Sequence, residues 1–172
     1  MKICEIDVGL TGAVAIVDGQ DVLFVDDMPV HQVASGKKLR AEVDLAALRE
    51  MLCARPVDHV MLEQVAARPG QGTVSMFRFG YSAGAVAGIV AALQLPHSFL
   101  LPRAWQKAVG VGPSPDAARQ RAAQLYPGAG PSLLRKRDAG RADALLIAAA
   151  GWRLLNQVPA GTRPTASGDE PG

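Results

Sequence analysis

The sequence predicts one α/β domain with a five-stranded mixed sheet, an antiparallel meander followed by parallel strands, and helices on both faces. Near the N-terminus, apolar runs over residues 2–9, 13–18 and 22–25 are separated by short glycine-containing turns, which is typical of strands joined in a meander. From residue 43 onward, helical periodicity alternates with short apolar runs, and this alternation places helices over the faces of a sheet. The 172 residues, 49% of them hydrophobic, suffice for one domain with one core.

The later elements follow from apolar periodicity and from turn residues. We expect helices over residues 43–54, 73–93, 102–109, 114–126 and 138–155, strands over 59–63 and 98–101, and loops over 30–40 and 127–137. The domain is therefore expected over residues 1–155. Residues 156–172 are rich in Pro, Gly, Ser and Thr, which predicts a disordered tail.

Three glycines recur on one face of the predicted helix over residues 73–93. Gly80, Gly84 and Gly88 are each four residues apart. Glycine costs about 1 kcal/mol relative to alanine inside a helix. Its repetition along one face predicts that another backbone passes close by.

Charge is unevenly distributed along the chain. Residues 1–54 hold five Lys/Arg and nine Asp/Glu, a net charge of −4, whereas residues 101–142 hold eight Lys/Arg and two Asp, a net charge of +6. The basic segment predicts either a face that binds a polyanion or an ordinary solvated surface, and charge alone leaves both open.

The remaining composition predicts a soluble protein of a reducing cytoplasm. Cys4 and Cys53 fit neither a disulfide framework nor a zinc site. The acidic residues that follow the N-terminus are unlike a signal peptide. The longest apolar run, residues 83–93, is shorter than the roughly 20 residues of a membrane span, so we expect no membrane partner.

Four acidic residues stand out by their context: Asp7 in an apolar strand, Glu63 at a strand end, and Asp138 and Asp143 near the start of the last helix. Strand interiors disfavour Asp, and burial of a lone carboxylate is costly. Asp138 and Asp143 lie about 140° apart around the helix. Asp138 could also be a helix-terminal acid favoured by the dipole, and Asp143 and Glu63 could be solvated surface acids.

A metal ion would explain why such carboxylates converge. Asp7 and Glu63 are expected at the same edge of the sheet, where like charges need a cation between them. Carboxylate oxygens suit Mg²⁺, with Mn²⁺ as a substitute. Two such ions about 4 Å apart can promote hydrolysis of a phosphodiester. The three histidines have no metal-site spacing, and the chain lacks a nucleophile elbow and a phosphate-binding loop.

Several motifs resemble one family. The opening IDVGLTGAVAIVDG resembles the first hairpin of the ribonuclease H-like nucleases, and VMLEQV resembles the strand that carries their glutamate. KRDAGRADALLIAAAG resembles the last helix of the RuvC Holliday-junction resolvases, especially the phage-type and plant chloroplast branch. QGTVSMFRFGYSAGAVAGIVAAL and PRAWQKAVGVG are similar to the same branch. The resemblance covers about residues 1–155.

This resemblance implies a set of site residues. Asp7, Glu63, Asp138 and Asp143 correspond to the catalytic, metal-binding acids, and Lys107 to a basic residue that faces the scissile phosphate. Bacterial RuvC proteins place the last two ligands three residues apart, whereas here position 140 is Gly. The residues expected to contact nucleic acid are Lys107, Arg135, Lys136, Arg137, Arg141, Phe77 and Phe79. Packing in the core is the alternative for the two phenylalanines.

The resemblance implies a Mg²⁺-dependent endonuclease that uses two ions per site and acts as a homodimer on four-way DNA junctions. Three alternatives remain: a ribonuclease H-like nuclease with another nucleic-acid substrate, a non-catalytic junction-binding protein, and a fragment of an actin-like or sugar-kinase fold. The last needs two such domains, for which the chain is too short.

Overall fold

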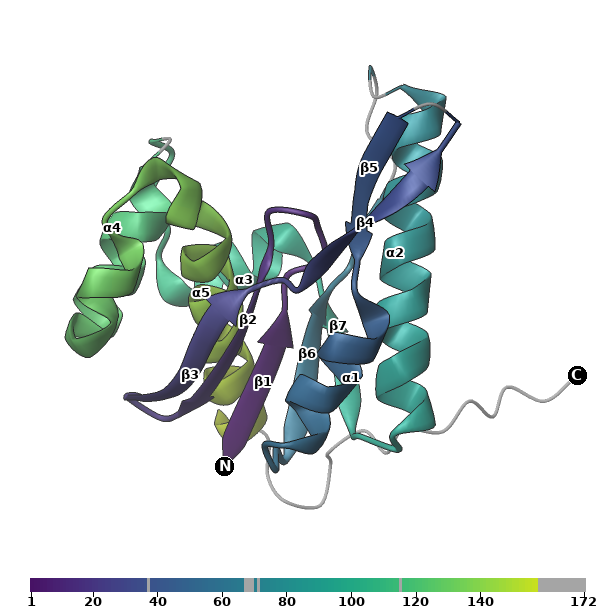
Figure 1. Cartoon of the computed structure of the whole chain (residues 1–172). Helices are drawn as coiled ribbons and strands as arrows, with labels where there is room; N and C mark the ends of the chain where they lie inside the picture. Colours follow the sequence, from purple (N-terminus) through teal and green to yellow (C-terminus); the bar gives the residue numbers. More distant parts are fainter. Residues whose placement is uncertain (37, 67–69, 71, 115, 158–172) are drawn as a thin grey trace, which may run out of the picture.

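The computed structural model describes residues 1–36, 38–66, 70, 72–114 and 116–157. Its central sheet has the strand order β3-β2-β1-β6-β7 (Figure 1). The strands are β1 (Lys2–Ile6), β2 (Ala13–Asp18), β3 (Asp21–Asp27), β6 (His59–Glu63) and β7 (His97–Leu100). β1 pairs antiparallel with β2 and parallel with β6, while β2–β3 is antiparallel and β6–β7 parallel. The predicted mixed sheet is therefore confirmed.

A separate hairpin occupies part of the segment that was expected to be a loop. β4 (Val30–Ser35) pairs antiparallel with β5 (Lys38–Val43), and the hairpin extends beyond the central sheet (Figure 1). The loop prediction for residues 30–40 is wrong. Five of the six β4 side chains are exposed, so β4 has no alternating apolar pattern. β5, in contrast, alternates polar and apolar residues (KLRAEV) and ends on the buried Val43, which is a strand signal.

Helices cover both faces of the sheet, as predicted. They are α1 (Leu45–Cys53), α2 (Thr73–Ala92), α3 (Pro102–Val109), α4 (Ala117–Leu125) and α5 (Ala139–Gln157). The expected loop over residues 127–137 instead contains two 3₁₀ helices, η1 (Pro127–Leu133) and η2 (Lys136–Asp138). The predicted tail lies, from residue 158 onward, outside the described residues.

The sheet separates two apolar cores. Alternate β1 residues face opposite sides: Ile3 belongs to the core beneath α3, α4 and α5, whereas Cys4 and Ile6 belong to the core beneath α1 and α2. Helix α5 lies across β1 and β2, and 11 of its 19 residues are buried. The central strand is therefore enclosed on both sides, and a charged side chain on it must find a partner within the protein.

Helix α2 differs from α5 because most of its surface is exposed, with only Val86 and Val90 fully buried. The glycine-face prediction is not met within the chain, since a methyl group added at Gly80, Gly84 or Gly88 would meet nothing within 4 Å. By length and composition alone, α2 is also long and apolar enough to cross a membrane. This helix thus carries an apolar surface without a partner in the described structure.

The start of α5 contacts the β1–β2 turn at backbone distance. A Cβ atom on Gly140 would lie 2.3 Å from the carbonyl oxygen of Thr11 and 3.0 Å from the Cα of Gly12. Gly12 is itself confined, because its own Cβ would lie 1.9 Å from the carbonyl oxygen of Asp7. This contact fixes the first turn of α5 against the end of β1.

We predict that Gly140→Ala destabilises the protein by about 1–3 kcal/mol or more, because overpacking against backbone cannot be relieved by a side-chain rotation. Gly80→Ala is the matched control. It places the same methyl group in open space on a helix and should be neutral or stabilising by up to about 1 kcal/mol. Chemical denaturation of both variants measures the difference. Equal stability of the two variants would contradict the close contact.

Candidate active site

Two of the predicted acids lie side by side at one edge of the sheet. Asp7 directly follows β1 and Glu63 ends β6, and the parallel register pairs Ile6 with Leu62. The main-chain amide of Asp7 donates to the carbonyl of Ala13 at 2.9 Å, which fixes Asp7 at the mouth of the hairpin. The expectation that these two acids share an edge is therefore met.

Asp143 joins them from α5. Burial, followed by the charges of Asp143 and Glu63, raises the pKa of Asp7 to about 7. Burial also raises the pKa of Asp143 to about 6, again with a contribution from Glu63. Among the described residues, neither Asp7 nor Asp143 has a side-chain hydrogen bond or ion pair. Three carboxylates thus lie close together without a compensating cation.

Glu63 is oriented by a tryptophan. The indole Nε1–H of Trp105 in α3 donates to Oε1 of Glu63 at 2.8 Å, and Trp105 is only 3% exposed. Trp105 was not identified from the sequence. A signal existed, because a buried indole N–H usually needs an acceptor and PRAWQK follows a strand that neighbours the one carrying Glu63.

Asp138 makes different contacts from the other three acids. Its carboxylate accepts hydrogen bonds from the main-chain amide of Arg135 at 2.7 Å and from Nη2 of Arg135 at 2.9 Å. The Arg135 side chain is the main cause that holds the pKa of Asp138 below its usual value. Asp138 is 2% exposed and does not contribute to the raised pKa of Asp7 or Asp143. These contacts favour the capping role.

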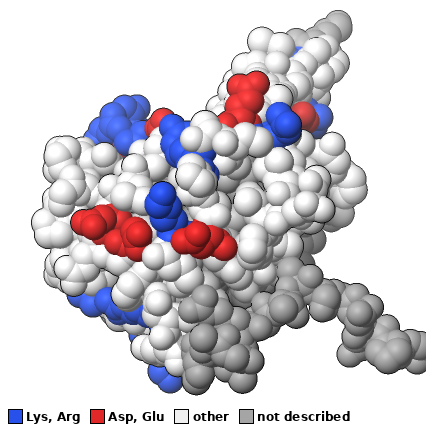
Figure 2. Space-filling view, turned by 90° about the horizontal axis from the view of Figure 1, so that it is seen from below, with Lys and Arg blue, Asp and Glu red and all other residues white. Residues whose placement is uncertain are grey.

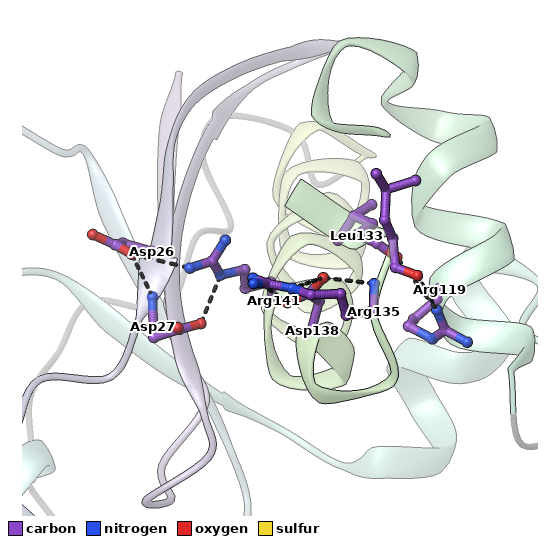
Figure 3. A network of polar contacts seen from close by, with 8 residues as sticks. Asp26, Asp27, Arg119, Leu133, Arg135, Asp138 and Arg141 are labelled. Carbon is purple, nitrogen blue, oxygen red and sulfur yellow. Dashed lines mark hydrogen bonds and ion pairs between the residues drawn. The ribbon is translucent and has the colours of Figure 1, made fainter. Parts of the chain in front are cut away.

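Arg141 belongs to a polar network beside this cap. Its Nε donates to Asp27 at 2.6 Å and its Nη2 to Asp26 at 3.3 Å, which joins α5 to the end of β3. Figure 3 shows Arg141 between these two aspartates and Asp138. With a side chain 16% exposed, Arg141 is committed to structural ion pairs in this conformation.

The other predicted nucleic-acid contacts lie on the surface. Lys136 and Arg137 are exposed in η2, and Lys107 is exposed on α3, two residues and therefore about 200° from Trp105. Lys107 therefore lies on another side of α3 than the Trp105 ring that contacts Glu63. Phe77 is 74% exposed on α2, whereas Phe79 is half-buried. On the face at the opposite end of β1, acidic and basic side chains are interspersed, as on an ordinary solvated surface (Figure 2).

The site carries a further buried acid. Glu5 of β1 is fully buried, and neither of its carboxylate oxygens has a hydrogen-bond partner. Burial raises the pKa of Glu5 well above its usual value, and the charges of Asp7, Glu63 and Asp143 raise it further. Glu5 was not among the residues predicted from the sequence. It could have been, because Glu5 is an acid within the apolar strand KICEI, as Asp7 is at its end.

The donor chemistry of this edge fits a hard divalent cation. As the side chains lie, no group of three or more His, Cys, Asp or Glu among the described residues is arranged to hold an ion. Carboxylate oxygens are nevertheless the ligands that Mg²⁺ prefers, and the orphaned carboxylate of Glu5 lies beside Asp7 and Glu63 without a counter-charge. Asp7, Glu63 and Asp143 are the described acids that come together at this edge, so a bound ion would take its carboxylate ligands from among them.

Comparisons with known proteins support the resemblance found in the sequence. No family model matches the chain. Over 132 residues, 75% of this chain, the sequence is 32% identical to the chloroplastic Holliday junction resolvase MOC1 of Chlamydomonas reinhardtii, but the match covers only 15% of that protein.

Solved structures confirm the predicted fold. RuvC of Thermus thermophilus, in complex with a Holliday junction substrate, matches 91% of this chain and 96% of its own with a TM-score of 0.65 and 15% identity. A second T. thermophilus RuvC structure matches 91% of this chain and 97% of its own with a TM-score of 0.57 and 16% identity. The chain therefore has the RuvC-like, ribonuclease H-like fold.

We predict that Trp105 and Glu63 are energetically coupled. Trp105→Phe keeps a buried aromatic ring but removes the only donor in the 2.8 Å hydrogen bond, and a hydrogen bond to a charged group contributes about 1.5–3 kcal/mol. A double-mutant cycle with Glu63→Ala should give a coupling free energy of at least about 0.5 kcal/mol in denaturant unfolding.

The matched control is Trp152→Phe, because the Nε1 of Trp152 is buried without a hydrogen-bond partner. Its loss should cost no hydrogen bond and show no coupling to Glu63→Ala. If the losses from Trp105→Phe and Glu63→Ala are simply additive, Trp105 does not position Glu63.

Proposed function

We propose that this chain, which has the RuvC-like fold, is a divalent-metal-dependent endonuclease that resolves four-way DNA junctions. The observation that carries the proposal is the gathering of Asp7, Glu63 and Asp143, without a compensating cation, at one sheet edge. The match to a chloroplastic Holliday junction resolvase supports the choice of substrate, as does the fold shared with RuvC bound to a junction.

Asp7, Glu63 and Asp143 hold the cations in this proposal. Two Mg²⁺ ions, for which Mn²⁺ substitutes, would supply activation of a water nucleophile and stabilisation of the leaving oxygen of the phosphodiester. The chain itself fixes the acids. The β1–β2 turn holds Asp7, the Trp105 indole orients the Glu63 carboxylate, and the Gly140 contact sets the height of Asp143 along β1.

The proposal does not require Asp138 as a metal ligand. A metal-ligand role for Asp138 remains a prediction, while its bonds to Arg135 support the alternative that it caps the start of α5. Its partner Arg135 is 52% exposed at the side chain and precedes the exposed Lys136 and Arg137. These three cations form the most accessible basic segment next to α5, and they are proposed to bind phosphates, as basic side chains do along a DNA backbone.

Other predicted contacts remain predictions. Lys107 would have to reach the scissile phosphate from the outer side of α3. Arg141 would have to leave Asp26 and Asp27 to bind DNA. The expected cytoplasmic location also stays a prediction, because the curated relative is chloroplastic.

A homodimer accounts for the exposed surface of α2. Val74, Phe77, Tyr81, Gly84 and Gly88 are spaced alternately by three and four residues, the spacing of a seam between paired helices. Val74, Phe77 and Tyr81 are 63%, 74% and 65% exposed, and the glycines leave room for a neighbouring backbone. Two copies would also provide the two sites that symmetric junction cleavage requires, and pairing would cover the apolar length of α2.

The test of the proposed function is cleavage of a synthetic four-way junction in Mg²⁺ or Mn²⁺, with a linear duplex of the same sequence as the alternative substrate. We expect the junction to be cut in preference. Asp7→Asn and Asp143→Asn should reduce the rate at least about 1000-fold, because each removes a carboxylate ligand. Asp21→Asn, an exposed acid on β3 outside this cluster, is the control and should retain the wild-type rate.

Asp138→Asn separates the two roles of that residue in the same assay. As a cap it should lose about 1 kcal/mol of stability and keep a near-normal rate, and as a ligand it should be nearly inactive. Full activity of Asp7→Asn, or preferential cutting of the linear duplex, would overturn the proposed function.

We further expect Tyr81→Glu to dissociate the dimer, since it introduces a charge at the centre of the α2 seam. Analytical ultracentrifugation should show a dissociation constant raised at least about tenfold, equivalent to about 1.4 kcal/mol. The control is Leu39→Glu, which alters an equally exposed apolar residue on the β4–β5 hairpin. A wild-type protein that stays monomeric at tens of micromolar would refute the α2 interface.

A further inference from the structure

Glu5 is the most anomalous side chain in the described structure. It lies on the central strand β1, has no exposed surface, and leaves both carboxylate oxygens without a partner. A buried carboxyl group without a hydrogen bond is costly whether it is charged or neutral. Asp27 and Asp138, in contrast, are each paired with an arginine.

The strand register places Glu5 beneath the acidic edge. Glu5 and Asp7 are two residues apart and therefore lie on the same face of β1, the face covered by α5. Its neighbours in the adjacent strands are Ala15 of β2 and Met61 of β6. Met61 is two residues before Glu63, as Glu5 is two residues before Asp7. The pair Glu5 and Met61 therefore lies one step further from the sheet edge than Asp7 and Glu63.

Glu5 is also within electrostatic reach of all three acids. Asp7, Glu63 and Asp143 each add to the burial effect on its pKa, in that order. Among the described residues no Lys, Arg or His forms an ion pair with it. Glu5 therefore lies near three other acids, and in the described part of the chain no ion pair compensates Glu5, Asp7 or Asp143.

We propose that Glu5 is a fourth carboxylate of the cation site, which lies behind Asp7 and strengthens the binding of a divalent ion. This inference rests on the proposed function, because it assumes that Asp7 binds a metal. The bound ion is the counter-charge that Glu5 lacks within the protein. Hard cations favour all-oxygen surroundings of this kind, and carboxylates behind the direct ligands typically change metal affinity 10–100-fold.

This assignment also bears on the four-acid site expected from the sequence. Asp138 was expected to complete the set, but its carboxylate is engaged by Arg135. Position 140, three residues before Asp143, has no room for any side chain. In this proposal Glu5 adds an acid from the strand, and its role does not depend on whether Asp138 is a cap or a ligand.

Isothermal titration of the metal-free protein with Mn²⁺, without DNA, tests the proposal. Glu5→Gln keeps the shape of the side chain and removes its charge, and it should weaken Mn²⁺ binding at least about tenfold. Its melting temperature in EDTA should equal or exceed that of the wild type, because an unpartnered buried acid has been replaced by a neutral group. Glu50→Gln, which alters an exposed glutamate on α1, is the matched control and should bind like the wild type.

Asp7→Asn distinguishes failure of the metal site from failure of the role proposed for Glu5. If Asp7→Asn loses Mn²⁺ binding while Glu5→Gln binds within twofold of the wild type, the metal site stands and the role of Glu5 is overturned. If the wild type binds no Mn²⁺, both proposals fail. A weaker affinity accompanied by a lower melting temperature in EDTA would make Glu5 a structural residue and count against the proposal. Should Glu5→Gln not fold, Glu5→Ala is assessed by the same criteria.

Discussion

The close contact between Gly140 and the β1–β2 turn determines where the acids of this protein meet. Because Gly140 approaches the backbone of Thr11 and Gly12 without an intervening side chain, the first turn of α5 lies directly over the end of β1. Asp143 directly follows that turn in α5, and Asp7 directly follows that strand. A larger residue at position 140 would lift α5 away and separate the two carboxylates.

The charges around the site divide into a neutralised part and an uncompensated part. Arg135 with Asp138, and Arg141 with Asp26 and Asp27, form pairs that fasten α5 to its surroundings (Figure 3). The acids directed toward the sheet edge have no such pairs. Arginines occur within the same short stretch of α5 and η2, yet none of them forms an ion pair with Asp7 or Asp143.

Single elements show how far sequence patterns reach. The β1–β2–β3 meander and the buried strand β6 were predictable because alternation and glycine turns are local features. The β4–β5 hairpin was predicted as a loop because the segment is polar and basic and β4 is mostly exposed, although the alternation in β5 (KLRAEV) is a strand signal. The glycine face of α2 was recognised, but no partner for it lies within the chain, so sequence and structure together point to a second molecule.

The sequence by itself determined the order of the elements, the sheet edge shared by Asp7 and Glu63, and the resemblance to RuvC-like nucleases, because these depend on local periodicity and on short motifs. Only the tertiary structure decided the partners of the acids. In the fold, Trp105 donates a hydrogen bond to Glu63, which lies 42 positions away in the sequence. The carboxylate of Asp138 accepts a hydrogen bond from Arg135, and Glu5 is buried without a hydrogen-bond partner. Partner choice depends on how α3 and α5 pack on the sheet, and no spacing along the chain encodes that packing directly.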